Sequence, residues 1–420
     1  MADPVTGMPE EARELEAIPT ARALTLLRLH DFRRVYLAIT ASELGDSLHY
    51  IALMWVALQT GGPLGVIAVR LADSIPALLF GLHGGLAADR WNRRSLMIGS
   101  DTVRAIVLVP VAIAGLSGHL PIWGLVVASF VLEAATSYFQ PAYGALVPAL
   151  VERKNVQQAN ALVQATAQAV SIGGWAIAAA LLTFMPISVF FAVNAVSFAV
   201  SALLLLGVRE RGSPAHSEAP HVREGIRELQ RRPTLGIGVI VLGVAVTISS
   251  GTWIAGMPTY VRDHLHGGAG AFSVVMIGYA AGAISSGAIL ARRPIRRKAL
   301  GSLVAWTLYL PAYLLIAVGH SIGIAIAGAF AAALAQSSAI VLLTSAAQEE
   351  VPDSLLGRVL GLISLVHRGA HATGLILVAP LFAVVAPAPV FAAASFGIAA
   401  VGIAGSLAVL RVQQPQLEHT

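Results

Sequence analysis

The sequence predicts an all-α membrane protein whose twelve transmembrane helices form two pseudo-symmetric six-helix bundles. The prediction depends on the composition, on apolar runs that recur along the whole chain, and on one long polar segment in the middle. Of the 420 residues, 56% are hydrophobic and only 12% are charged, against roughly a quarter charged in an ordinary soluble domain. Each apolar run is about long enough to cross a hydrocarbon layer of roughly 30 Å. The expected solvent is therefore lipid.

Twelve apolar runs, separated by charged or Pro/Gly-rich breaks, are the expected helices. Six precede the long polar segment, at 33–59, 63–88, 96–117, 120–143, 157–184 and 187–208. Six follow it, at 234–258, 269–291, 298–319, 321–347, 357–384 and 387–411. The expected organisation is a cytoplasmic N-terminal segment, a bundle, a cytoplasmic linker, a second bundle and a cytoplasmic tail, at 1–32, 33–208, 209–233, 234–411 and 412–420. Within the linker, EGIRELQ can form a short surface helix, and a solvated run of charges is an equal alternative.

Lys and Arg residues gather in alternate loops, which indicates the orientation of the chain. Nearly all of the 27 lie in the termini, the linker and the loops on that same side, counting Arg104 at the start of the third helix. The opposite loops contribute only Arg262. Because cytoplasmic loops carry the excess of Lys and Arg, both termini are expected in the cytoplasm. The polar first 30 residues do not have the pattern of a cleaved signal peptide, so the first helix is the expected insertion signal.

Several function classes are excluded by what the sequence lacks. Without cysteine, it has no disulfide, thiolate metal site or cysteine nucleophile. His367 and His371 share a helix face at i, i+4, a spacing that can chelate a metal, but the pattern has neither a third ligand nor the glutamate of a zinc protease. We therefore expect no bound metal and no enzymatic activity. The sequence has no G-x-x-x-x-G-K-[ST] loop for ATP, and we expect no cofactor. The net charge of +5 is spread over short loops, so no nucleic-acid partner is expected.

The loop between the second and third helices carries the pattern GGLAADRWNRR, from Gly84 to Arg94. A related pattern, GAILARRPIRRK, ends the second helix of the other half, with Arg292 in the place of Asp89. Such a match indicates an internal repeat. A carboxylate at the membrane boundary can meet the unpaired amides at the start of another helix, while nearby arginines pair with carboxylates. The loop is therefore a candidate latch between helices.

Together with other patterns, this loop resembles the major facilitator superfamily, and specifically its macrolide-efflux and enterobactin-exporter-like branch. The resemblance covers nearly the whole chain and depends on HDFRRVYLA, SELGDSLHYIALMWVALQTGG, GSDTVRA, FQPAYGALVPALV, QQANAL and QEEVPDSLLGRVLGL. It implies the major facilitator fold, the cytoplasmic (inner) membrane of a bacterium, and export of a small molecule by rocking-type alternating access.

The resemblance also implies a gate on the cytoplasmic side. Asp89 would hold the two halves together when the cavity opens outward, facing the start of the eleventh helix near Gly357 and Arg358. The gating residues expected on this basis are Gly84, Gly85, Asp89, Arg90, Arg93, Arg94, Asp101, Arg104, Gly357 and Arg358.

Ionisable residues inside the spans are functional candidates, because each costs several kcal/mol unless it faces a partner or a wet cavity. They are Glu43, Asp46, His49, Arg70, Asp73, Glu133, His367 and Arg368. Arg70 can pair with Asp73 or Asp46, and Glu133 and Arg368 fall at a similar depth. We expect Asp46 and Glu133 to carry protons. The alternative is that ion pairs such as Arg70 with Asp73 only fix helix packing.

These inferences lead to one expected function and three alternatives. The expectation is a proton-coupled antiporter that exports a drug-like or siderophore-like amphipathic molecule, because an apolar cavity with few charges suits one. Its partners would be the small-molecule substrate, protons and membrane lipids, and we expect a monomer. The alternatives are a lipid or lysolipid flippase, an importer on the same fold, and a membrane receptor or scaffold that transports nothing.

Overall fold

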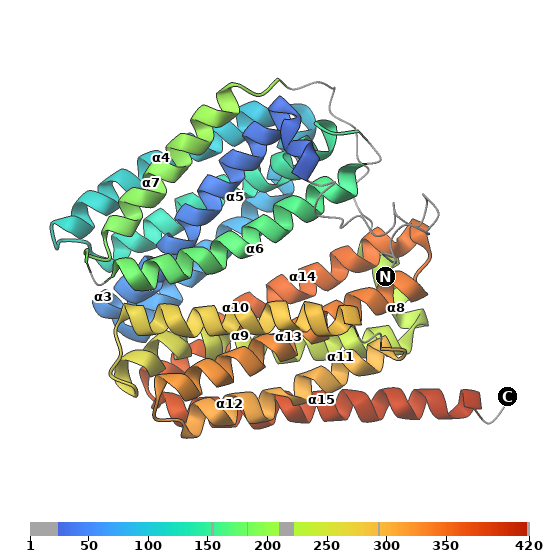
Figure 1. Ribbon diagram of the computed structural model, residues 1–420. Helices are drawn as coiled ribbons and strands as arrows, with labels where there is room; N and C mark the ends of the chain where they lie inside the picture. Colours follow the sequence, from blue (N-terminus) through green and yellow to red (C-terminus); the bar gives the residue numbers. More distant parts are fainter. Residues whose placement is uncertain (1–23, 153–154, 183, 210–221, 293–294, 418–420) are drawn as a thin grey trace, which may run out of the picture.

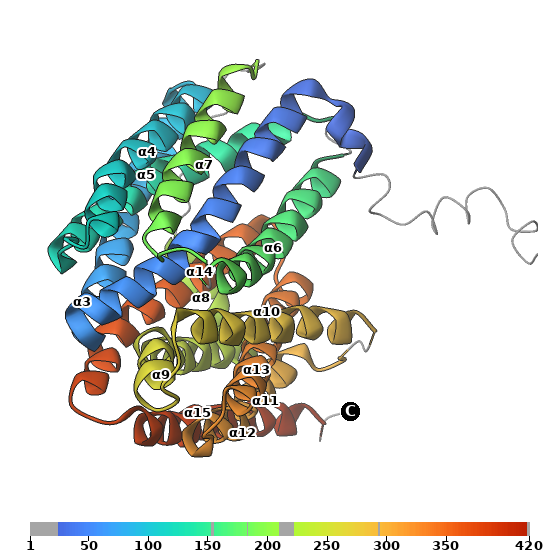
Figure 2. The ribbon, with the colours of Figure 1, turned by 60° about the vertical axis from the view of Figure 1, so that its left-hand side comes forward.

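The computed structural model describes residues 24–152, 155–182, 184–209, 222–292 and 295–417, and every regular element within them is a helix. Figure 1 shows two helical bundles, one drawn from blue to green and the other from yellow to red. The bundles converge at one end and diverge toward the end that carries both chain termini, and Figure 2 shows the same divergence from another side. The outermost parts of the expected N-terminal segment, linker and tail, at 1–23, 210–221 and 418–420, lie outside the described residues.

The first bundle contains the helices of the N-terminal half. They are η1 (Leu26–Arg28), α3 (His30–Arg90), α4 (Arg93–Leu116), α5 (Ile122–Ala149), α6 (Val156–Leu181) and α7 (Val189–Leu206). The second bundle follows a short helix, α8 (Val222–Arg231). It contains α9 (Pro233–Asp263), α10 (Ala269–Arg292), α11 (Lys298–Thr307), α12 (Tyr309–Val318), α13 (Ile322–Glu350), α14 (Asp353–Leu377), η3 (Ala379–Ala383) and α15 (Pro387–Leu417).

The helices confirm the predicted fold class. Eleven helices of the described chain are long and apolar enough to cross a membrane, with α11 and α12 forming one span. The first of them, α3, is two spans joined at a kink, so the described chain crosses twelve times. We call the end that carries His30 and Leu417 the terminal face, and the end that carries Gly62 the opposite face.

The two spans of α3 meet at Gly62, where the sequence predicts a short loop. Gly62 has φ 61° and ψ −159°, a region of backbone conformation that is essentially restricted to glycine. A Cβ atom at this position would have no neighbour within 4 Å, so the requirement for glycine is conformational and not steric. One residue thus reverses the chain between the first two spans.

Several helices extend past their predicted ends. The third span begins at Arg93 instead of 96, because the side chain of Asn92 accepts a hydrogen bond from the Ser95 amide at 2.8 Å and caps the helix. The helix α9 continues beyond 258 to Asp263, so Arg262 is helical. Long charged side chains at a helix end can reach polar surroundings without ending the helix, which is why charge alone misplaces these boundaries.

The linker segment EGIRELQ forms a helix and is not an irregular run of solvated charges. Within α8, the side chains of Glu228 and Leu229 are buried, and Glu228 accepts a hydrogen bond from Arg232 Nε at 2.7 Å. At Gly225, a Cβ atom would lie 3.0 Å from the carbonyl oxygen of Arg358. The helix α8 therefore packs closely against the start of α14.

We expect Gly62→Ala to lower the free energy of unfolding by about 1–3 kcal/mol, because alanine is strained at this φ and ψ. The measurement is the midpoint of thermal unfolding of the purified protein in detergent. Gly99→Ala is the matched control, since a Cβ atom there also meets nothing within 4 Å and Gly99 lies inside α4. Its midpoint should stay the same or rise. Equal midpoints for the two variants would contradict the assignment.

Candidate functional site

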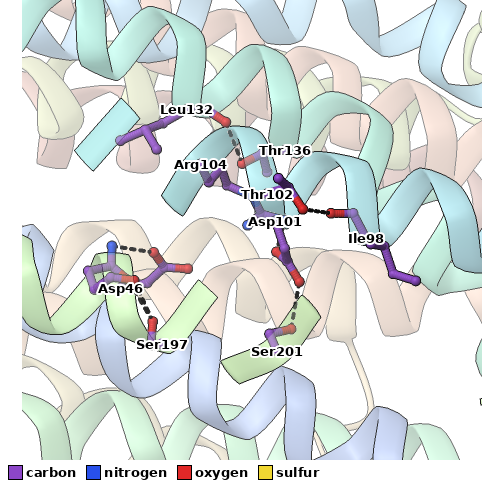
Figure 3. Close-up of polar contacts among 10 residues, drawn as sticks. Asp46, Ile98, Asp101, Thr102, Arg104, Leu132, Thr136, Ser197 and Ser201 are labelled. Carbon is purple, nitrogen blue, oxygen red and sulfur yellow. Dashed lines mark hydrogen bonds and ion pairs between the residues drawn. The ribbon is translucent and has the colours of Figure 1, made fainter. Parts of the chain in front are cut away.

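A buried ion pair lies in the middle of the first bundle, between Asp101 and Arg104 of α4. Their side chains are 0% and 5% exposed, and Arg104 Nη2 lies 2.9 Å from Asp101 Oδ1. The hydroxyl of Ser201 on α7 donates to Asp101 Oδ2 at 2.6 Å (Figure 3). The guanidinium carbon of Arg104 lies 4.4 Å from the centre of the Phe139 ring and 4.5 Å from that of Phe198. The pair thus joins α4 to α5 and α7.

This position differs from the one that the sequence pattern predicts. The pattern assigns Asp101 and Arg104 to the surroundings of the loop motif, with Arg104 at a helix start. Because α4 begins at Arg93, Arg104 lies about 16 Å along the helix, at 1.5 Å per residue. It is therefore inside the bundle, away from the loop.

Asp46 lies near this pair, on α3. Its Oδ1 accepts a hydrogen bond from Asn194 Nδ2 of α7 at 3.1 Å, and Ser197 donates to Asn194 Oδ1 at 2.9 Å. Gly45 has no room for a Cβ atom against Asn194 and Ser197, so the close approach of α3 and α7 requires glycine there. Arg104 is within electrostatic range of Asp46. The carboxylate therefore has a neutral hydrogen-bond partner and a nearby cation that already pairs with Asp101.

A small polar cavity of about 230 Å³ adjoins Asp46. Its lining comes from α3, α4, α5 and α6 and comprises Ile39, Ser42, Glu43, Asp46, Arg104, Thr136, Phe139, Gln140, Tyr143, Val163, Gln164 and Ala167. The Ser42 hydroxyl is buried and has no hydrogen-bond partner among the described residues. A polar space of this size can hold several water molecules. The cavity is thus a site for water or a small polar ligand inside the bundle.

A second charged group lies on α3, α5 and α14. Arg70 Nη1 lies 2.6 Å from Asp73 Oδ2, so Asp73 and not Asp46 is the partner of Arg70. Glu133 is within electrostatic range of both of these residues and of Arg368 on the other bundle. Arg368 is exposed, and no ion pair joins it to Glu133 among the described residues. The two charges thus belong to different bundles and lie within electrostatic range of each other.

The histidines take two kinds of position. His49 is buried, with its ring 5.3 Å from the Phe191 ring and nearly perpendicular to it, so it packs in the core of the first bundle. The rings of His367 and His371 lie 4.7 Å apart, and His371 is within electrostatic range of Arg70. Among the residues that the structure describes, no three potential ligands gather in a way that could hold a metal.

Some residues of the loop motif contact other helices of the first bundle, and others make no such contact. Arg93 Nη1 donates to the Ala145 carbonyl at 3.3 Å, and Arg94 Nε donates to the Leu205 carbonyl at 2.9 Å. A Cβ atom at Gly84 would collide with the Ser137 backbone, so α3 and α5 touch there. These contacts brace the helix ends of one bundle at the terminal face.

Asp89 is half-buried and Arg90 is exposed. Neither has an ion pair or side-chain hydrogen bond within the described ranges. A Cβ atom at Gly85 would have no neighbour within 4 Å. The start of α14, with Gly357 and Arg358, packs against α8 instead. In this conformation the loop motif and the start of α14 are separate.

The two bundles contact each other toward the opposite face. Arg262 Nη1 of α9 donates to the Leu58 carbonyl of α3 at 2.9 Å. The rings of Trp55 and Phe272 stack with their centres 6.4 Å apart. The helices α6 and α10 lie side by side in both ribbon views and are in contact. The bundles therefore touch toward the opposite face and diverge toward the terminal face.

The sequence pattern missed the polar partners of the candidate carboxylates. Asn194 and Ser201 lie in the sixth span, where an amide and a hydroxyl interrupt an otherwise apolar run, VFFAVNAVSFAVSALLLL. Polar side chains inside a span commonly hydrogen-bond to a neighbouring helix. This signal was available, but it does not say which neighbour receives the bond.

Comparison with known proteins places this geometry in context. Residues 35–375 match the sequence family described as Major Facilitator Superfamily. Enterobactin exporter EntS of Shigella dysenteriae serotype 1 is 27% identical over 406 residues, which cover 90% of this chain and 92% of the relative. Macrolide efflux protein A of Enterococcus faecalis is 24% identical over 235 residues, which cover 54% of this chain and 71% of the relative.

Other relatives match over part of their length, and solved structures match over almost all of it. YvqJ, an uncharacterized MFS-type transporter of Bacillus subtilis, is 25% identical over 61% of this chain, and the chain spans 63% of its length. YfiS, another uncharacterized MFS-type transporter of Bacillus subtilis, is 26% identical over 50% of this chain, and the chain spans 51% of its length. A mutant of the nucleoside transporter NupG has a TM-score of 0.70 at 12% identity, covering 90% of this chain and 99% of that one. A POT family transporter has a TM-score of 0.67 at 13% identity, with 92% and 96% covered. These structural likenesses concern the fold alone.

We expect Arg104→Met to lower the free energy of unfolding by about 3–5 kcal/mol, because it leaves Asp101 buried without its cation. The double variant Asp101→Leu with Arg104→Met removes both charges and should recover part of the loss. Thermal unfolding in detergent measures both effects. Arg227→Met, at an exposed position on α8, is the control and should leave the midpoint unchanged. A double variant less stable than Arg104→Met would contradict the importance of this pair.

Proposed function

The chain belongs to the Major Facilitator Superfamily, and on that premise we propose that this multi-pass membrane transporter is a proton-coupled antiporter that exports a small amphipathic organic molecule. Drug-like or siderophore-like compounds are the proposed substrates. The names of two relatives, a macrolide efflux protein and an enterobactin exporter, favour export. The bacterial cytoplasmic membrane is the proposed location, with the terminal face in the cytoplasm.

The observation that carries the proposal is the setting of Asp46. Its carboxylate lies inside a lipid-embedded bundle, has a neutral amide as its hydrogen-bond partner, and borders a polar cavity. Arg70 is already paired with Asp73, and Arg104 with Asp101. A buried carboxylate without an ion-pair partner can gain or lose a proton without breaking a salt bridge. Asp46 is therefore the preferred proton carrier.

The cavity also suggests a path for the proton. Glu43 lies one helical turn closer to the terminal face than Asp46, and Tyr143 lines the same cavity near the end of α5. Water between these groups could pass a proton from Asp46 toward the cytoplasm. Glu133, which is within electrostatic range of Arg368 on the other bundle, is proposed as the second site, where a change in charge alters the attraction between the bundles.

Alternating access follows from the two faces of the molecule. For the bundles to separate at the opposite face, the contacts from Arg262 to Leu58 and from Trp55 to Phe272 would have to break. In that state we propose that Asp89 meets the amides at the start of α14 near Gly357 and Arg358. The arginines Arg93 and Arg94 keep the first bundle rigid as it rocks.

We expect Asp46→Asn to abolish protonophore-sensitive extrusion, because asparagine cannot exchange a proton. The measurement is retention of a panel of fluorescent dyes and macrolides in cells making the protein, with and without a protonophore. Asp31→Asn, at the start of α3 outside the cavity, is the control and should extrude like the unmodified protein. Extrusion that persists in Asp46→Asn and still responds to the protonophore would contradict the assignment of Asp46 as the proton carrier. Accumulation in place of extrusion would indicate an importer.

A second test concerns the opposite face. Since the chain has no cysteine, Trp55→Cys with Phe272→Cys introduces the only two thiols, and we expect their oxidation to stop transport and reduction to restore it. The control is Phe382→Cys with Phe391→Cys, whose rings lie 6.0 Å apart within one bundle, and its oxidation should not stop transport. Unimpaired transport by a fully cross-linked first pair would argue against opening at this face.

A further inference from the structure

Aromatic side chains from both bundles gather below the closed opposite face. In the first bundle, the rings of Tyr50 on α3 and Trp175 on α6 lie 6.4 Å apart. In the second, the rings of Trp253 on α9 and Tyr279 on α10 lie 4.6 Å apart. We call these four residues the central aromatic cluster. All four are half-buried.

The two halves of the cluster lie on neighbouring helices of the two bundles. The helices α6 and α10, which carry one member each, pack together (Figures 1 and 2), and Tyr279 is within electrostatic range of Tyr50. The stacked rings of Trp55 and Phe272 lie further toward the opposite face. The cluster therefore lies between the contacts at the opposite face and the end at which the bundles diverge.

Tyr279 is held in place from behind. Its hydroxyl donates to Gln336 Oε1 at 3.3 Å, and Tyr309 donates to the same oxygen at 2.7 Å. A ring whose hydroxyl is fixed in this way loses little conformational entropy when another ring packs on it. The second bundle thus offers a preformed aromatic surface.

Two hydrogen-bond donors near the cluster have no acceptor. The indole Nε1 of Trp175 and Nε of Arg70 are both buried and without a hydrogen-bond partner in the part of the chain that the structure describes. The Trp175 ring lies 6.4 Å from that of Tyr50, and the Arg70 guanidinium lies 5.9 Å from the same ring. Buried donors are almost always satisfied, so a ligand that supplies acceptor oxygens here would complete both groups.

We propose that the central aromatic cluster binds a flat aromatic ring that carries hydrogen-bond-accepting oxygens, so that the substrates are oxygenated aromatic molecules. This inference rests on the proposed function, whose substrate site it specifies. Ring faces favour stacking on Trp253 and Tyr279, while Trp175 and Arg70 donate to the oxygens. Aromatic faces also attract cations, but a cation without acceptor oxygens would leave the Trp175 and Arg70 donors unpaired.

The test uses two flat fluorescent probes, 7-hydroxycoumarin, which carries acceptor oxygens, and ethidium, a cation without them. Binding to the purified full chain is measured by equilibrium dialysis, and extrusion is measured in cells. We expect 7-hydroxycoumarin to bind and ethidium not to bind.

Trp253→Leu should weaken binding of 7-hydroxycoumarin about tenfold, because it removes a stacking surface, and Trp253→Phe should restore most of it. Trp175→Phe, which keeps a ring but removes the N–H, should weaken binding several-fold. Trp123→Leu, at a 69% exposed position on α5, is the control and should bind normally.

The outcomes separate this inference from the proposed function. Binding of 7-hydroxycoumarin that depends on Trp253 and Trp175, without any extrusion, would support the site and count against export. Protonophore-sensitive extrusion of macrolides or ethidium by a protein that does not bind 7-hydroxycoumarin would overturn the inference and leave export standing. Binding that is equally strong in Trp253→Leu and the unmodified protein would also overturn it.

Discussion

The buried pair of Asp101 and Arg104 is the interaction on which the first bundle depends. An unpaired guanidinium in a lipid-embedded bundle would be costly, and here it is offset by a carboxylate and two aromatic rings. Through these partners one side chain connects α4 to α5 and α7, and its field reaches Asp46 on α3. The candidate proton carrier thus lies in the field of a charge that is already paired with another carboxylate. A change at Arg104 would alter packing and proton binding together.

The two bundles share a fold but differ in chemistry. The first holds most of the buried charge, in the groups around Asp46 and around Arg70. The second contains buried neutral contacts, such as Tyr309 with Gln336 and Tyr313 with the Ser249 carbonyl, and its ion pair of Lys298 with Glu349 lies nearer the surface. We propose that a proton that binds in the first bundle alters how the two bundles meet.

The sequence by itself determined the architecture, because hydrocarbon thickness limits the length of a span and lipid leaves backbone groups no partner outside a helix. It identified the twelve spans and the rare charges within them. It grouped Arg104 with the charged loop, although the predicted span begins at 96, because charge was the only available sign of position. The cap at Asn92, which moves the start of that span to Arg93, is a local hydrogen bond.

Only the tertiary structure decided which polar groups meet. Packing sets the rotation of each helix about its axis. This rotation brings Asp46 into hydrogen-bonding distance of Asn194, while Arg70 pairs with Asp73 on its own helix. Close approaches such as that of Gly45 to α7 made these pairings possible. The central aromatic cluster also depends on how the two bundles pack against each other, because its members come from four helices of both halves. Sequence spacing relates residues on one helix, whereas contacts between helices depend on their relative rotation and tilt.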